Sequence, residues 1–273
     1  MADLVFYTAE YPYGNSETFV EAELKYLSES FGSVFIIPLI GKGKTRSIPL
    51  NVKILKPLIS RKVKKWHLAF YGLWGLLSFK DFNGIESRGN KIRLVKKIEY
   101  LGYGYFIYKQ IKKRLIRGEV IHYSYWLNFS AFAIAVLHQK GLIKYCVSRA
   151  HRFDIYDEVG EQSLIFIRQS ILSNLTNIFF ISEHGLNYLK RKFPEVAYKF
   201  KLNRLGTIDP CFSNPYSEYG VFSIVSCSSI NENKRVDLIA ESLEIIKAKS
   251  PEQKLKWFHI GGGEKSNEIR SYC

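Results

Sequence analysis

The chain lacks the features that mark several common classes of protein. Its four cysteines form no Cys-x-x-Cys pair, which disfavours a zinc site and a disulfide framework and predicts free thiols in a reducing compartment. The longest nearly apolar stretch, residues 68–79, has 12 residues, whereas a transmembrane helix needs about 20. The N-terminus, MADLVFYTAE, carries an acidic residue where a signal peptide carries positive charge. These absences predict a cytoplasmic protein.

Two motifs for ligands are also missing. No G-x-G-x-x-G sequence follows the first apolar run, which disfavours a dinucleotide-dependent oxidoreductase. The chain has no D-x-D sequence, and no second histidine follows His151 at metal-ligand spacing. We therefore predict no metal and no cofactor.

Acidic residues are scarce in one quarter of the chain. Between Lys53 and Arg117, 17 Lys or Arg residues stand against Asp81, Glu86 and Glu99, so this segment holds nearly all of the net charge of +15. Aromatic residues are interleaved with the basic ones: Trp66, Phe70, Tyr71, Trp74, Phe79, Tyr100, Tyr103, Tyr105, Phe106 and Tyr108. This pattern predicts docking on an anionic membrane surface. A solvated basic helical pair and a nucleic-acid-binding face are the alternatives, although no nucleic-acid motif is present.

Apolar runs typical of buried strands alternate with amphipathic helices along the chain. The predicted strands are 4–9, 33–40, 120–125, 145–149, 177–182, 222–229 and 254–261. The predicted helices are 20–31, 128–140, 161–174, one that ends near Phe193, and 234–249. Such alternation predicts an α/β fold with a doubly wound parallel sheet.

A segment rich in Pro, Ser, Asn and Gly, residues 207–220, interrupts this alternation. We therefore predict a complete Rossmann-like domain over 1–210, in which 53–117 is a basic and aromatic insertion. A linker over 211–220 and the start of a second domain over 221–273 follow. Two strands with one complete helix are not expected to close a core of their own.

Ligands of such sheets bind at the carboxyl ends of the strands, so the loops there are the candidate sites. After the first strand, Gly14 would permit close backbone approach, and Asn15 or Ser16 would cap the next helix. After the strand 145–149, His151 is a candidate acid or base, and Arg152 and Asp154 could bind hydroxyls or phosphate. Each loop could equally be an ordinary capped turn.

In the second domain, Lys234 and Arg235 are predicted at the first turn of a helix. Cations at that end oppose the helix dipole, which a bound diphosphate would explain, although an exposed basic pair is the simpler alternative. The three glycines 261–263 after the last strand could admit a nucleotide, but they do not form a dinucleotide fingerprint.

Taken in order, these stretches resemble the GT-B glycosyltransferases of family 4, which use nucleotide sugars and retain the anomeric configuration. YGNSETFVEAELKYL is similar to the first loop and helix of members that build bacterial surface polysaccharides such as capsule or lipopolysaccharide. YWLNFSAFAIA with SRAHRFDIYDE resembles their acceptor-side strand, helix and histidine loop, and ISEHGLNYL with NRLGTID resembles the end of that domain. IVSCSSINENKRVDLIAESLEIIK with LKWFHIGGGE resembles the start of the donor domain.

The resemblance implies a role for each matching residue. His151 would line the catalytic pocket, Gly14 would face the donor phosphates and the reacting sugar, and Lys234 would neutralise the diphosphate leaving group. The other implied contacts are Asn15, Ser229, Arg235, Gly262 and Gly263 to the donor and Glu17, Arg152 and Asp154 to the acceptor. The donor would be a substrate and no metal would be needed. The resemblance also implies that the protein is located at the inner membrane face, near a lipid-linked acceptor.

Two departures from the family pattern change the expectation. Many members have an arginine where this chain has Ser229, so leaving-group binding would depend more on Lys234. Their donor domain also continues further and carries two glutamates that hold the nucleotide sugar. We therefore expect a glycosyltransferase with an incomplete donor domain, inactive by itself. The alternatives are a non-catalytic acceptor- or membrane-binding subunit completed by a partner chain, and a basic nucleic-acid-binding protein.

Overall fold

The computed structural model describes residues 1–14, 16–59, 63, 65–78, 94–116, 118–157, 162–213, 215 and 219–271. The chain divides into two compact units, Met1–Ile208 and Asp209–Cys273. We call them unit 1 and unit 2 and describe each by itself.

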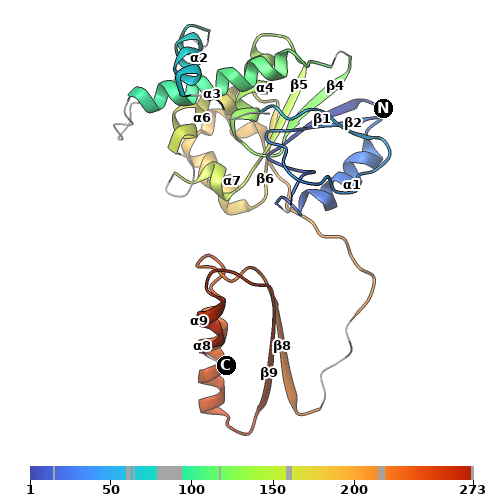
Figure 1. The fold of residues 1–273 in the computed structure, drawn as a ribbon, viewed down its shortest axis with the longest axis vertical. Helices are drawn as coiled ribbons and strands as arrows, with labels where there is room; N and C mark the ends of the chain where they lie inside the picture. The colour runs from blue at the N-terminus through green and yellow to red at the C-terminus, as the bar shows by residue number, and fades with distance from the viewer. Residues whose placement is uncertain are drawn as a thin grey trace. The chain divides into compact units, whose positions relative to one another are not determined.

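Unit 1 is built on a parallel sheet of seven strands in the order β3-β2-β1-β4-β5-β6-β7 (Figure 1). The strands are β1 (Asp3–Thr8), β2 (Val34–Pro38), β3 (Val52–Ile54), β4 (Val120–Ser124), β5 (Tyr145–Ala150), β6 (Asn177–Phe180) and β7 (Phe200–Leu202). The chain adds β2 and β3 on one side of β1 and then returns to add β4 to β7 on the other. The carboxyl ends of β1 and β4 therefore flank a switch point, where open α/β sheets bind ligands.

Helices cover both faces of this sheet (Figure 1). They are α1 (Val20–Ser30), α2 (Lys65–Ser78), α3 (Leu94–Lys112), α4 (Phe129–Gln139), α5 (Arg152–Ile155), α6 (Gln162–Asn174), α7 (Glu183–Lys192) and a 3₁₀ helix (Pro194–Lys199). Since successive residues of a strand point to opposite faces, β1 directs Val5 and Tyr7 into the core beneath α3, α4 and α6. Leu4 and Phe6 point the other way, into the core beneath α1. The predicted doubly wound α/β architecture is confirmed.

Every strand predicted from an apolar run is present, with ends within two residues of the predicted ones. The short edge strands β3 and β7 were not predicted. Each has three residues, too few to show an alternating or continuous apolar pattern. Hydrogen bonds to β2 and β6, which the sequence pattern does not reveal, hold them in place.

In the basic segment the described residues form α2 and α3, which pack closely together. An added Cβ would lie 2.2 Å from Ile98 O at Gly72 and 2.1 Å from Leu68 O at Gly102. Glycine at these two positions therefore permits the close approach of the helices. No helix in the described part of the chain is long and apolar enough to cross a membrane.

Unit 2 contains the parallel pair β8 (Val221–Cys227) and β9 (Lys254–Ile260) with helices α8 (Asp237–Lys249) and α9 (Ser266–Arg270). Its buried apolar cluster consists of Ile230, Val236 and Ile269, with Trp257 packed on it. The predicted start of α8 near residue 234 is wrong. Arg235 has a φ of +47°, which an α-helix excludes, and the helix begins only at Asp237.

Candidate functional site

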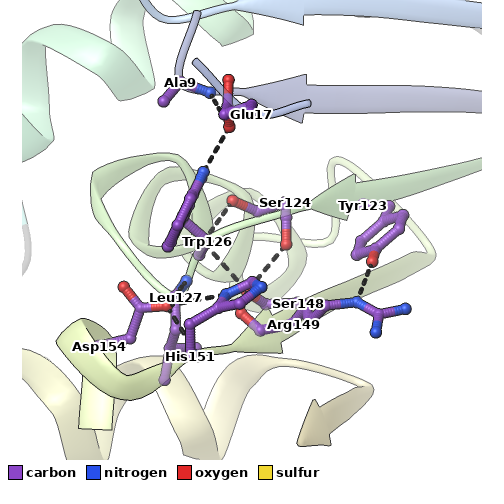
Figure 2. Close-up of polar contacts among 10 residues, drawn as sticks. All are labelled: Ala9, Glu17, Tyr123, Ser124, Trp126, Leu127, Ser148, Arg149, His151 and Asp154. Atoms are coloured by element: carbon purple, nitrogen blue, oxygen red, sulfur yellow. Dashed lines mark hydrogen bonds and ion pairs between the residues drawn. The ribbon is translucent and has the colours of Figure 1, made fainter. Parts of the chain in front are cut away.

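Three loops of unit 1 that follow β1, β4 and β5 meet around His151. The centroid of its ring lies 4.3 Å from that of Trp126, 5.0 Å from that of Tyr125 and 6.5 Å from that of Phe19. Asp154, in α5, approaches the imidazole from the same loop as His151 (Figure 2). We call these five residues the histidine cluster. It lies at the switch point of the sheet, where the sequence places a ligand.

The His151 imidazole is buried and incompletely satisfied. The residue is 6% exposed, and neither ring nitrogen makes a hydrogen bond of normal geometry with a described residue, although the imidazole faces the backbone N–H of Asp154 in a capping-box arrangement. Nδ1 lies 3.4 Å from Asp154 Oδ2, close enough for an ion pair but long for a hydrogen bond. The Tyr125 hydroxyl in the same cluster is also buried without a described partner. Unpaired buried groups cost about 1–3 kcal/mol each, so such a concentration is typical of a binding site.

Asp154 fixes the position of the imidazole. Its Oδ2 accepts hydrogen bonds from the backbone N–H groups of His151 at 3.1 Å and of Leu127 at 3.2 Å (Figure 2). The same oxygen therefore joins the loops that follow β4 and β5 and lies beside Nδ1. Because two backbone donors already occupy this oxygen, Asp154 can act on a ligand mainly through the histidine.

Glu17 ties the loop after β1 to the histidine cluster. Its carboxylate accepts hydrogen bonds from the backbone N–H of Ala9 at 3.1 Å and from Trp126 Nε1 (Figure 2). It also accepts from the backbone N–H groups of Glu10 and Tyr11, both at 2.7 Å. A carboxylate has about four acceptor positions, and protein donors take all of them. Glu17 therefore holds the loop in place. Few hydrogen-bond acceptor positions remain on its carboxylate for the contact with the acceptor substrate that the sequence predicts.

The loop that contains Gly14 is held by an arginine that sequence reasoning missed. Gly14 has a φ of +62°, and its Cβ would meet nothing closer than 3.8 Å, so backbone conformation alone favours glycine there. Arg46 donates from Nε to Gly14 O at 2.9 Å, from a terminal nitrogen to Ser16 O, and pairs with Glu21 at 3.1 Å. Asn15, the other predicted donor contact in this loop, lies outside the described residues. No motif marks Arg46, because it is more than 30 positions away in the sequence from the loop that it holds.

Arg152 does not join the histidine cluster, since it is exposed on α5. Arg149, three residues earlier at the end of β5, is buried instead and pairs with Glu23 at 2.9 Å. Tyr123 completes this group, because its hydroxyl donates to Glu23 at 2.7 Å and accepts from Arg149 Nε at 2.8 Å. Arg149 and Glu23 border a pocket of about 310 Å³ between α1 and residues 203–206. Sequence reasoning missed Arg149, although a lone arginine at the end of an apolar strand was a usable signal.

In unit 2 the loops after β8 and β9 lie side by side and bring three predicted residues together. Ile230 N donates to Gly262 O at 3.1 Å, and Lys265 N donates to Ile230 O at 3.3 Å. A Cβ at Gly263 would lie 2.2 Å from Ile230 O, so a side chain is excluded there. Ser229, Gly262 and Gly263 are all exposed at these paired loops, which we define as residues 228–235 and 261–265.

The two predicted cations of unit 2 differ in their surroundings. Arg235 pairs with Asp237 at 3.0 Å. Its guanidinium is therefore already neutralised by the first turn of α8, and a diphosphate would have to compete with that carboxylate. Lys234 is exposed and enters none of the ion pairs among the described residues, so its ammonium is available to an anion. No cluster of three His, Cys, Asp or Glu side chains suited to a metal occurs in the described ranges.

Comparison with known proteins identifies the fold. No protein-family model and no curated protein sequence matches the chain. Solved structures do match. One is the trehalose-6-phosphate synthase OtsA, at 12% identity and a TM-score of 0.61, with 99% of this chain and 68% of that one covered. Another is the lipopolysaccharide outer core galactosyltransferase WaaB, at 13% identity and a TM-score of 0.60, with coverage of 100% and 64%.

These neighbours are glycosyltransferases of the GT-B type. The chain has the GT-B-like α/β fold. A third similar structure, from E. coli and described as bound with UDP-2-fluoro glucose, has a TM-score of 0.61 at 13% identity over 99% of this chain and 68% of that one. At such low identity the likeness shows the fold, and the chemistry must be argued from the residues.

Proposed function

We propose that this protein transfers a sugar from a nucleotide-sugar donor to a lipid-linked or glycan acceptor, with retention of configuration. The main observation in support is the buried imidazole of His151, held beside Asp154 at the switch point of the sheet. One similar structure was determined with a nucleotide-sugar analogue, and another, of trehalose-6-phosphate synthase, concerns glycosyl transfer with retention.

In this proposal the histidine cluster binds the reacting sugar. Asp154 beside Nδ1 favours the tautomer with its proton on that nitrogen. Nε2 then accepts from a sugar hydroxyl once the aromatic side chains around it move to admit the sugar, since this nitrogen is buried in the structure. The rings of Phe19 and Trp126 supply flat apolar surface to the sugar.

The paired loops of unit 2 bind the diphosphate. Lys234 supplies a positive charge, and the turn at Gly262 and Gly263 lets the donor approach the backbone. When the bond from the anomeric carbon to the phosphate oxygen breaks, the nucleoside diphosphate leaves with the electron pair, and Lys234 stabilises the charge that develops. The acceptor oxygen bonds to the same face of that carbon, and its proton passes to the leaving phosphate. The proposal requires no metal.

Nucleotide-sugar binding tests the donor part. Titration of the purified chain with UDP-, GDP-, TDP- and ADP-sugars should show saturable binding of one nucleotide class. Lys234→Gln should weaken this binding by about 10- to 100-fold, because a charge-assisted contact contributes about 1.5–3 kcal/mol. Lys249→Gln, an exposed site at the end of α8, should leave it unchanged. A folded chain that binds none of these sugars would contradict the proposal.

The role of His151 needs a chemical readout. In cell extracts supplied with a radiolabelled donor, His151→Asn should reduce the label transferred to lipid or glycan by about 100-fold or more. His184→Asn changes an exposed histidine of α7 and should have no effect. If both variants lose the same amount of label transfer, or neither loses any, His151 has no specific role in the reaction.

A further inference from the structure

One side of α2 exposes a row of large apolar side chains. Trp66 is 64% exposed, Phe70 54%, Leu73 55% and Trp74 48%. We call these four residues the aromatic stripe. Their spacing places them on one side of the helix, whereas Leu68 and Gly72 on the other side pack against α3. A contiguous exposed apolar patch is typical of an interaction surface.

A pocket of about 390 Å³ lies beside the C-terminal part of α3. Its lining residues, which we call the lysine pocket, are Tyr105, Tyr108, Lys109, Lys112, Lys113 and Lys140. None of the ion pairs among the described residues involves these four lysines. The dipole at the end of α3 accounts for Lys109 and Lys112, which stand in its last turn, but Lys113 and Lys140 add further charge. Four cations around one cavity repel each other and favour an anionic ligand.

A chain of aromatic contacts connects the stripe to the pocket. The ring centroid of Phe70 lies 6.4 Å from that of Trp74 and 6.1 Å from that of Tyr71. Tyr71 lies 5.9 Å from Tyr105, which in turn lies 5.9 Å from Tyr108. The Lys109 ammonium is 6.0 Å from the Tyr105 ring. Ring contacts across α2 and α3 therefore connect the exposed apolar side chains to the lysine pocket.

We propose that this surface binds a bilayer that contains anionic phospholipids. The aromatic stripe enters the boundary between headgroups and acyl chains, and the lysine pocket holds a lipid phosphate. Apolar side chains beside a cluster of lysines match the two layers of such a membrane, which neither a nucleic acid nor a neutral protein surface does. This inference depends on the proposed function at one point: a membrane-bound protein could reach a lipid-linked acceptor. The docking itself does not require sugar transfer.

Vesicle flotation without any sugar nucleotide tests this docking independently of sugar transfer. The full chain should float with vesicles of phosphatidylcholine and phosphatidylglycerol and stay behind with phosphatidylcholine alone. Added salt should weaken the binding. The variant Lys109→Gln/Lys112→Gln/Lys113→Gln should bind about 100-fold more weakly, since each lysine near an anionic surface contributes about fivefold. The control Lys190→Gln/Arg191→Gln/Lys201→Gln removes the same charge from exposed sites on α7 and β7 and should float like the wild type.

Tryptophan emission tests insertion of the stripe. Anionic vesicles should shift the emission of the wild-type chain to shorter wavelength. Trp66→Phe/Trp74→Phe should abolish that shift and still float, because the apolar surface is kept while Trp126 and Trp257 lie elsewhere. Trp66→Ser/Phe70→Ser/Trp74→Ser should lose flotation, and its circular dichroism should match the wild type, since the stripe is exposed.

Several results would overturn the proposal. Equal flotation with neutral vesicles, or an equal loss of binding in the control variant, would show that the lysine pocket does not bind the membrane. Complete competition by soluble glycerol phosphate would show a phosphate site that needs no bilayer. Binding to DNA without binding to vesicles, or a dimer that the serine variant abolishes, would assign the surface to a nucleic acid or to a second copy of the chain.

Discussion

The loop after β1 in unit 1 and the turn after β9 in unit 2 both follow a parallel strand and both contain a glycine in the left-handed region. Gly14 has a φ of +62° and Gly261 a φ of +139°. Around Gly14 there is space, and the loop is held by the side chains of Glu17 and Arg46. A Cβ at Gly261 would instead lie 2.0 Å from Ser228 O, because the backbones of two loops touch there. The first loop is shaped by side-chain hydrogen bonds and the second by close contact of backbones.

This difference has a consequence for function. The histidine cluster is assembled before any ligand arrives, since Asp154 and Glu17 accept hydrogen bonds from the loops that carry it. The paired loops of unit 2 are held by backbone contacts, and their exposed glycines and Lys234 face solvent. Variants should therefore act through stability in unit 1 and through local backbone shape in unit 2.

Glu17→Gln should give the largest effect. A glutamine retains one oxygen acceptor and adds an NH₂ group that faces N–H donors, so two of the four hydrogen bonds are lost. We expect unit 1 to lose about 3–4 kcal/mol of unfolding free energy, because each buried unpaired donor costs about 1–3 kcal/mol. Urea unfolding followed by circular dichroism measures it.

Glu29→Gln is the matched control for that change. It makes the same substitution on α1 at an exposed position, and its effect should stay within about 0.5 kcal/mol. Similar losses of unfolding free energy in the two variants would mean that the four hydrogen bonds to Glu17 do not stabilise unit 1.

The buried His122 should make the stability of unit 1 depend on pH. Burial lowers the pKa of this histidine to about 4, and its Nδ1 lies 2.9 Å from the Tyr7 hydroxyl. Between the ordinary pKa of 6.5 and this value the unfolded chain binds more protons than the folded one. Stability should therefore fall by up to about 3 kcal/mol as the pH drops through that window.

Urea unfolding at a series of pH values from about 7 to about 5 checks this, with His122→Asn as the comparison. The asparagine can still accept from Tyr7 but does not titrate, so the slope in this window should decrease. An unchanged slope would assign the acid sensitivity to other groups.

Gly263→Ala should distort the paired loops of unit 2, whereas Gly262→Ala should not. The Cβ at position 263 would lie 2.2 Å from Ile230 O, but the one at 262 meets nothing closer than 3.9 Å. Overpacking of this kind costs about 2 kcal/mol. Trp257 fluorescence during urea unfolding reports on unit 2. If Gly262→Ala is stable but weakens nucleotide-sugar binding, the ligand itself occupies that space.

The sequence predicted the strands of unit 1 well because the central ones contain nearly continuous apolar runs, such as LVFYT in β1. KLKWFHI in β9 alternates instead between apolar and polar residues, which also predicts a strand. It could not predict the partners that assemble the site. Arg46 acts on a loop from a distant position, and nothing in its local sequence marks it. Glu17 was named only as an acceptor contact, because its hydrogen bonds to the loop after β1 and to Trp126 appear only in the folded chain. The start of α8 was misplaced for a similar reason, because the left-handed residue Arg235 has no sequence signature. His151 was identified from its neighbours, and its enclosure by Phe19 and Trp126 only became visible in the folded chain.

Cysteine alkylation compares the accessibility of the two units directly, because each unit has a thiol within a strand. Cys146 of β5 is fully buried, and burial raises the pKa of its thiol to about 11, so about one molecule in a thousand is thiolate near pH 8. Cys227 of β8 is exposed. With iodoacetamide and peptide mapping, Cys227 should react at least about 100-fold faster than Cys146, and urea should abolish the difference. Comparable rates in the native chain would mean that the core of unit 1 opens as readily as the surface of unit 2, and the contrast between them would fail.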